Sequence, residues 1–143
     1  MTFPEQEVAK AAAVLWPPLE QGSSPTSPDI TVERLDHALR VFNNLRDLGE
    51  SPLASMRSLP NRSGAALRQL IEDAILALRA SPAQVDAQAG EILYLYYVRH
   101  IGGHYVVMLR VALSKATYFN RRSYGVRRLV DRLKELEEKA TAV

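Results

Sequence analysis

The chain has 143 residues, enough for one domain with one hydrophobic core, and its 47% hydrophobic content excludes a chain that is disordered throughout. Its net charge of +2 is near neutral, and the absence of cysteine excludes disulfides, thiolate zinc sites and a cysteine nucleophile. No apolar run reaches the roughly 18 residues of a membrane span, so we expect no membrane contact. Residues 1–7 are acidic and lack the basic region of a signal peptide, so we expect a cytoplasmic protein.

The first 30 residues predict a helix and a linker. Proline is tolerated in the first turn of a helix over residues 4–16, and the apolar side chains there share one face: Val8, Ala12, Leu15 and Trp16. Pro17 and Pro18 end this helix, and the proline- and serine-rich stretch after them predicts an extended linker. The chain is therefore divided into an N-terminal helix and linker over residues 1–30 and a helical domain over residues 31–143.

Two shorter helices are predicted next. Thr31 is a suitable N-cap for a helix that runs to about Leu48, and Gly49 suits the left-handed position just after a helix end. Ser51 and the proline after it predict the start of a short helix over residues 53–59.

Two longer helices follow. Residues 65–78 have the clearest amphipathic pattern, with five apolar residues at helical spacing: Leu67, Leu70, Ile71, Ile75 and Leu78. Another helix begins between residues 82 and 89 and runs to about His100. Its end, residues 92–98, is apolar almost all round, which places it at the centre of the core. A β-strand is the alternative for this run, but no strong turn signal precedes it, which favours the helix.

The last third predicts a short helix, a turn and a long helix. A glycine pair breaks the chain at residues 102–103, and residues 104–112 form a short helix with two inward valines, Val107 and Val111. After a two-residue turn, the long helix covers residues 115–139, and its buried side consists of Phe119, Val126, Leu129 or Val130, Leu133 and Leu136. Gly125 inside this helix predicts a kink or a close contact.

Positive charge is concentrated in this last third. Residues 99–134 contain nine lysines and arginines and one acid, Asp131, whereas residues 1–98 contain eight basic and twelve acidic residues. The near-neutral total therefore hides a strongly positive segment, which is what the phosphate backbone of a nucleic acid attracts. The alternative is that the basic run is only the solvated face of a terminal helix, stabilised by pairs such as Glu135 with Lys139.

The order of residues in this segment fits a helix-turn-helix over residues 104–139. Such a motif needs apolar anchors, here Val107, Val111 and Leu113, then a tight turn and a second helix whose first turns reach base edges. We therefore predict a small all-α domain, ending in a long helix, that binds double-stranded DNA with residues 115–122 as its recognition helix. The predicted contact residues suit phosphates, thymine methyl groups and the edges of guanine and adenine: Arg110, Ser114, Lys115, Thr117, Tyr118, Asn120, Arg121, Arg122 and Arg128.

Residues 96–121 resemble the helix-turn-helix of the sigma-factor region-four type. In that family a bulky helix ending in tyrosine is followed by a turn with glycine, a short helix and a Ser-x-x-Thr-Tyr/Phe-x-x-Arg recognition helix, which this chain matches with Ser114, Thr117, Tyr118 and Arg121. The part upstream, residues 31–79, is similar to the helical region before this motif in some multidomain bacterial regulators. The resemblance covers residues 31–139, is specific at residues 114–118, and implies a free-standing regulator of transcription.

The first helix of the motif departs from the family pattern. The family usually has acidic and small residues there, whereas this chain has an apolar run that includes Tyr105, Val106, Met108 and Leu109. A second hypothesis is therefore a helical adaptor that binds a protein partner through residues 105–109 or through the Trp16 helix. A third is a homodimer that binds a two-fold DNA site, with residues 4–16 exchanged between subunits.

The sequence contains no recognisable catalytic set, so we predict no enzyme activity and no cofactor. No glycine-rich phosphate loop is present, and the adjacent acids Glu72 and Asp73 point in different directions on a helix. His100 and His104 have the spacing of two metal ligands on a helix, but the glycine pair between them breaks that helix, and no third ligand is near in the sequence. The sequence therefore predicts no metal site.

Overall fold

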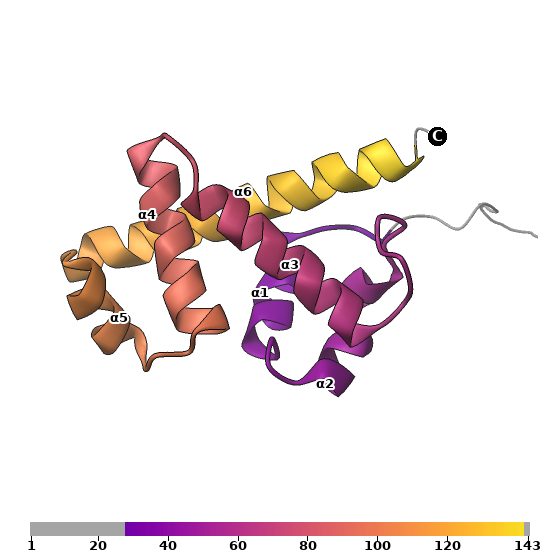
Figure 1. The fold of residues 1–143 in the computed structure, drawn as a ribbon, viewed down its shortest axis with the longest axis horizontal. Helices are drawn as coiled ribbons and strands as arrows, with labels where there is room; N and C mark the ends of the chain where they lie inside the picture. Colours follow the sequence, from indigo (N-terminus) through magenta and orange to yellow (C-terminus); the bar gives the residue numbers. More distant parts are fainter. Residues whose placement is uncertain (1–27, 142–143) are drawn as a thin grey trace, which may run out of the picture.

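The computed structural model describes residues 28–141, and every regular element in that part of the chain is helical, which confirms the all-α prediction (Figure 1). The predicted helix over residues 4–16 lies outside the described residues. The elements in chain order are α1 (Val32–Arg40), α2 (Leu45–Gly49), the 3₁₀ turn η3 (Pro52–Ser55), α3 (Gly64–Arg79), α4 (Gln84–Leu93), the π-helical segment η4 (Tyr94–Val98), α5 (His104–Val111) and α6 (Lys115–Thr141).

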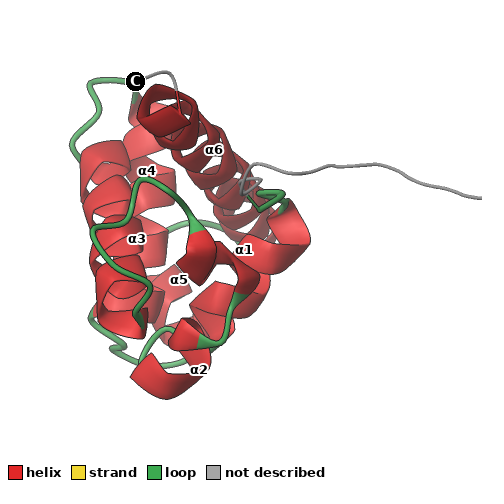
Figure 2. Ribbon diagram, turned by 90° about the vertical axis from the view of Figure 1, so that its right-hand side faces the viewer, coloured by secondary structure: helices red, strands yellow, loops and turns green. Residues whose placement is uncertain are grey.

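The long helix α6 is the element around which the others are arranged. It packs against α1, α3 and α4, and α3 lies alongside α4 (Figures 1 and 2). The short helix α5 sits near the N-terminal end of α6, on the side of the molecule away from α2 (Figure 1). None of the helices between residues 28 and 141 has the length and hydrophobicity needed to cross a membrane.

The structure divides the predicted helix over residues 32–48 into α1 and α2. Thr31 caps α1 as expected, but α1 ends at Arg40. Asn44 then starts α2 by accepting a hydrogen bond from the backbone N–H of Asp47 at 3.1 Å. The prediction of one continuous helix was wrong because the Asn44 side chain provides a second N-cap. Phe42, at the break between the two helices, is buried in the core.

Two glycines explain how closely α2 and α3 approach each other. Gly49 is the last residue of α2 and is not in a left-handed conformation, so that expectation was wrong. It lies against Gly64, the first residue of α3. A Cβ at Gly64 would lie 1.9 Å from the backbone oxygen of Leu45, which leaves room for glycine alone. The short helix expected over residues 53–59 is a single 3₁₀ turn, capped by Ser51.

The two middle helices agree with the sequence patterns. Ser63 caps α3 through a 3.0 Å hydrogen bond from the N–H of Ala66, and the apolar stripe from Leu67 to Ile75 is buried. The run over residues 92–98 is helical, as expected, but it widens into the π-helical η4 at its end. Gly125 of α6 makes the expected close contact, because a Cβ there would lie 2.9 Å from Cδ1 of Leu93 in α4.

A buried carboxylate anchors the chain after η3 to α6. Glu137 is almost fully buried, and its two oxygens accept hydrogen bonds from the backbone N–H groups of Arg57 at 2.8 Å and Ser58 at 3.0 Å. The main core beside it is formed by apolar side chains of α1, α2, η3, α3 and α6, with Leu93 and Tyr97 from the end of α4 and from η4. This core fixes α6 as a rigid base for the helices at its other end.

Candidate nucleic-acid interface

The segment from α5 to α6 has the order of elements of a helix-turn-helix, a short helix followed by a tight turn and a second helix. The eight residues of α5 end at Ala112, which adopts a left-handed conformation with φ 57° and ψ 45°. Leu113 and Ser114 complete a three-residue turn, and α6 begins at Lys115. Helices joined by a turn of three or four residues define the motif. The structure therefore confirms the short helix, the turn and the long helix that the sequence predicts here.

Ser114 caps α6 as predicted. Its Oγ accepts a hydrogen bond from the backbone N–H of Thr117 at 3.3 Å and donates one to the Thr117 hydroxyl at 3.0 Å. This cap orders the first turn of α6 and engages the Thr117 side chain, which is half-buried. The exposed amides at this helix start are a favourable place for a phosphate.

A small apolar cluster holds the two helices of the motif on α4. Its buried members are Ile92, Leu95, Val107 and Tyr118, and Val111 and Leu113 pack against them. The three predicted anchors of the motif, Val107, Val111 and Leu113, are therefore all in apolar contact. The cluster fixes α5 and the first turns of α6 relative to η4.

Tyr118 is an internal residue, so its predicted contact with DNA was wrong. Its side chain is 0% exposed, and its hydroxyl lies 2.8 Å from Nδ1 of His104. Burial is the largest cause that raises the pKa of Tyr118 to about 12, so the hydroxyl stays protonated and can donate to that nitrogen. Phe119, which was expected on the buried side, is 37% exposed instead. The buried stripe of α6 therefore starts one residue earlier than predicted.

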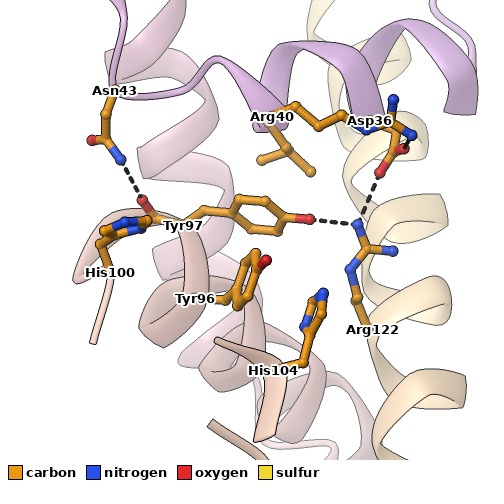
Figure 3. Close-up of a pocket in the computed structure, with 9 residues that line it drawn as sticks. Asp36, Arg40, Asn43, Tyr96, Tyr97, His100, His104 and Arg122 are labelled. Carbon is orange, nitrogen blue, oxygen red and sulfur yellow. Dashed lines mark hydrogen bonds and ion pairs between the residues drawn. The ribbon is translucent and has the colours of Figure 1, made fainter. Parts of the chain in front are cut away.

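Arg122 points into the molecule as well, away from the recognition surface on which the sequence placed it. Its Nη2 donates to Oδ1 of Asp36 in α1 at 2.9 Å and to the hydroxyl of Tyr97 in η4 (Figure 3). Burial opposes the charge, but the hydrogen bonds and charges of Tyr97 and Asp36 outweigh it and raise the pKa of the guanidinium. Arg122 therefore remains charged and joins three helical elements.

Arg121 and Arg128 are partly occupied by α4. Nε of Arg121 donates to Oε1 of Gln88 at 3.0 Å, and Nε of Arg128 lies 3.7 Å from Oδ1 of Asp86. Asp86 also accepts a hydrogen bond from the hydroxyl of Tyr124. The positive charge that the sequence concentrates in this segment is therefore divided between the surface and internal contacts.

The outward surface of the motif retains part of the predicted set. Arg110, Lys115 and Asn120 are exposed, and within the described part of the chain none of them forms an ion pair or a side-chain hydrogen bond. Ser114 is exposed beside them. Phe119 and Ser123 are also exposed and were not expected among these outward residues. The inward stripe of α6 can be counted back in helical turns from Leu133, Leu129 and Val126 through Arg122 to Tyr118. Phe119 and Ser123 each follow a residue of this stripe and lie beside it.

The exposed side of α5 is apolar. Tyr105 is 70% exposed and Leu109 is 62% exposed, and Val106 is exposed beside them. Met108, which the sequence also assigned to this surface, is half-buried against the small cluster. Phe119 joins the same end of the molecule, because its ring packs on His104 of α5 with centroids 5.2 Å apart.

Comparison with known proteins adds no further assignment. No protein-family model, curated protein or solved structure matches the chain.

Proposed function

We propose that the protein binds double-stranded DNA as a transcriptional regulator, with the start of α6 as its recognition helix. The observation that carries the proposal is the three-residue turn between α5 and the Ser114-capped α6, which leaves Lys115 and Asn120 facing outward. In this motif the N-terminal residues of the second helix contact base edges in the major groove. The sequence resemblance to the sigma-factor region-four type points to the same function.

The burial pattern assigns the roles differently from the sequence alone. Lys115 and Arg110 suit phosphate oxygens, and Asn120 suits the N6/N7 edge of adenine. Phe119 has the apolar surface that contacts a thymine methyl group. Arg122 supports the recognition helix from behind through Asp36 and does not touch the duplex.

The number of outward cations sets the expected salt dependence. With phosphate contacts from Arg110, Lys115 and the exposed Arg127, the logarithm of the binding constant falls with the logarithm of salt concentration at a slope of about −3. This slope is modest for a DNA-binding protein. It follows from the internal use of Arg121, Arg122 and Arg128.

Fluorescence anisotropy with a labelled mixed-sequence duplex tests the proposal. Arg110→Ala and Lys115→Ala should each weaken binding about fivefold at low salt, because each removes one phosphate contact. Arg46→Ala is the matched control, since Arg46 is an exposed arginine on α2, at the opposite end of the molecule. Equal binding by all three variants, or no rise in anisotropy at low salt, would contradict the proposal.

The exposed apolar side of α5 favours a second candidate, a helical adaptor. Tyr105, Leu109 and Phe119 are flanked by the cations Arg110 and Lys115, so the complementary partner is an amphipathic helix with acidic residues around its apolar face. A synthetic helical peptide of that pattern should bind, and Leu109→Asp should abolish its binding while Arg46→Ala leaves it unchanged. If the peptide binds both variants equally, this candidate fails.

A homodimer on a two-fold DNA site is compatible with the first candidate. Recognition helices of such dimers lie one turn of duplex apart, about 34 Å. The predicted exchange of residues 4–16 concerns a part of the chain outside the described residues. Sedimentation equilibrium tests the dimer directly, because a protomer has a mass of 15.9 kDa.

A further inference from the structure

A hollow of about 530 Å³ opens on the inner side of the helix-turn-helix, between α1, η4 and the start of α6 (Figure 3). Its volume falls in the range of small-molecule sites, roughly 300 to 1,000 Å³. Its lining includes Asp36, Arg40, Tyr96, Tyr97, His104 and Arg122. None of them belongs to the outward surface proposed to contact DNA.

The positive side chains that line this hollow outnumber the negative ones. Among the residues that the structure describes, Asp36 is the only carboxylate that lines the hollow, and two guanidinium groups share it: Oδ2 accepts from Arg40 at 2.8 Å, and Oδ1 accepts from Arg122 at 2.9 Å. The described wall therefore carries one uncompensated positive charge. The side chain of Arg122 is only 21% exposed, so part of this charge is held away from bulk water, where its attraction for an anion is stronger.

Two backbone irregularities occur on the same wall. The π-helical turn of η4 places Tyr96 and Tyr97 side by side at the hollow, and His100 just beyond it adopts a left-handed conformation with φ 53°. Single π turns are frequent at functional sites, and a left-handed backbone in a residue other than glycine costs about 1 to 2 kcal/mol. Asn43 holds this irregular segment by donating to the backbone oxygen of Tyr97 at 3.3 Å.

The rest of the wall consists of aromatic side chains that pack against one another. Tyr96 stacks on His104 with ring centroids 4.0 Å apart and planes within 2°, and it meets Tyr97 edge to face at 4.7 Å. The hydroxyl of Tyr118 holds His104 in place from the other side. The hollow thus combines a positive end at Arg40 and Arg122 with an apolar side at Tyr96 and Tyr97.

We propose that this hollow binds a small organic anion, with a carboxylate or phosphate group against Arg40 and Arg122 and the organic part against Tyr96 and Tyr97. Charge-assisted hydrogen bonds from arginine suit both anionic groups. The inference stands independently of DNA binding, because it uses none of the outward residues of α6.

Amide NMR titrations with three probes at constant ionic strength test whether the hollow prefers an anionic ligand and which anionic group it binds more tightly. Benzoate and phenyl phosphate carry the two anionic groups on the same ring, and benzamide is the neutral counterpart of benzoate. We expect saturable shifts for the amides of residues 36–43 and 96–104 with at least one anion, and binding of benzamide that is at least about tenfold weaker. The tighter of the two anions identifies the natural group as a carboxylate or a phosphate.

Matched arginine variants test whether the anion binds in this hollow. Arg40→Gln should weaken binding of the tighter anion about fivefold, because Arg40 lines the hollow and, with a side chain that is 70% exposed, can be replaced without loss of folding. Arg46→Gln should leave the affinity unchanged, since Arg46 does not line the hollow. The proposal is overturned if the shifts never saturate with either anion, or if benzamide binds as tightly as the tighter anion. Equal affinities of the Arg40→Gln and Arg46→Gln variants would also overturn it.

Discussion

The main core and the small cluster beneath the helix-turn-helix hold the chain together in different ways. The main core joins buried leucine, isoleucine and phenylalanine side chains from α1, α2, α3 and α6. The small cluster has four buried residues, and one of them, Tyr118, is a polar aromatic whose hydroxyl bonds to His104. Global stability therefore depends on the first region, while the position of the motif depends on a few contacts that can be changed without unfolding the rest.

Arg122 connects the two regions. Its guanidinium bonds to Asp36, a residue of α1 that is 86 positions earlier in the chain, and to Tyr97 of η4. A cation in the predicted recognition helix thus stabilises internal contacts. If the two regions are largely separate, substitutions in each should have different effects.

The largest effect is expected where α2 and α3 touch. In Gly64→Ala the new Cβ would overlap the Leu45 backbone oxygen, at 1.9 Å, so we expect a loss of about 4 kcal/mol or more in the free energy of unfolding. Gly103→Ala is the control, because nothing lies within 4 Å of a Cβ there and its φ of −73° suits alanine. Urea denaturation measures both variants, and a Gly64→Ala protein as stable as the control would refute the close approach.

Cavities in the two regions should have different consequences. Leu67→Ala in the main core should lower the free energy of unfolding by about 3 kcal/mol, and Val107→Ala in the small cluster by about half of that. Native-state hydrogen exchange should show faster exchange throughout α3 and α6 for the first variant. For Val107→Ala the change should be confined to α5 and the first turns of α6. Uniform acceleration in both variants would mean that the two regions unfold as one unit.

Removing one buried hydroxyl from the motif should lower the free energy of unfolding less than the cavity variants do. Tyr118→Phe keeps the buried ring but deletes the hydrogen bond to His104, so we expect a loss of about 1 kcal/mol. Tyr105→Phe removes a hydroxyl from an exposed ring on α5 and should leave stability unchanged. Equal denaturation midpoints for the two variants would show that the bond between His104 and Tyr118 does not stabilise the protein.

The smallest effect is expected from pH. Burial, followed by the charge of Arg122, lowers the pKa of His104 below its ordinary value of 6.5. The unfolded chain therefore takes up a proton first, and the contribution of His104 to stability is complete above pH 6.5 and is lost as pH falls through the lower folded pKa. His104→Gln should flatten the fall in unfolding free energy between about pH 7.5 and pH 5, as measured by urea denaturation at a series of pH values. An unchanged slope in this variant would contradict the prediction.

The ends of most helices could be predicted because short-range chemistry fixes them. Thr31 and Ser114 each cap the helix that the sequence assigned to them, and the turn between α5 and α6 lies where it was expected. The break between α1 and α2 was missed, although Asn44 carries the necessary side chain, because the apolar stripe from Leu35 to Leu45 continues across it.

The candidate site was predicted only in outline, because charge and helical spacing do not show which side of a helix is covered. Tyr118 and Arg122 share the inward stripe of α6 with Val126 and Leu129, so they fill the interior. Asn120 lies on the opposite side and stays outward, whereas Lys115 is in phase with the inward stripe and is exposed as the first residue of α6. A stripe counted back from the apolar end of α6 places Tyr118 and Arg122 inward and Asn120 outward.

An all-helical domain with a long helix capped by Ser114 follows from the order of residues, because capping and helical periodicity act over a few residues. The pairing of Arg122 with Asp36, the π turn of η4 and the positive hollow that these residues line arise only in the folded chain. Such contacts join positions far apart in the chain, and their energy comes from burial and charge pairing that exist only once α1, η4 and α6 have met.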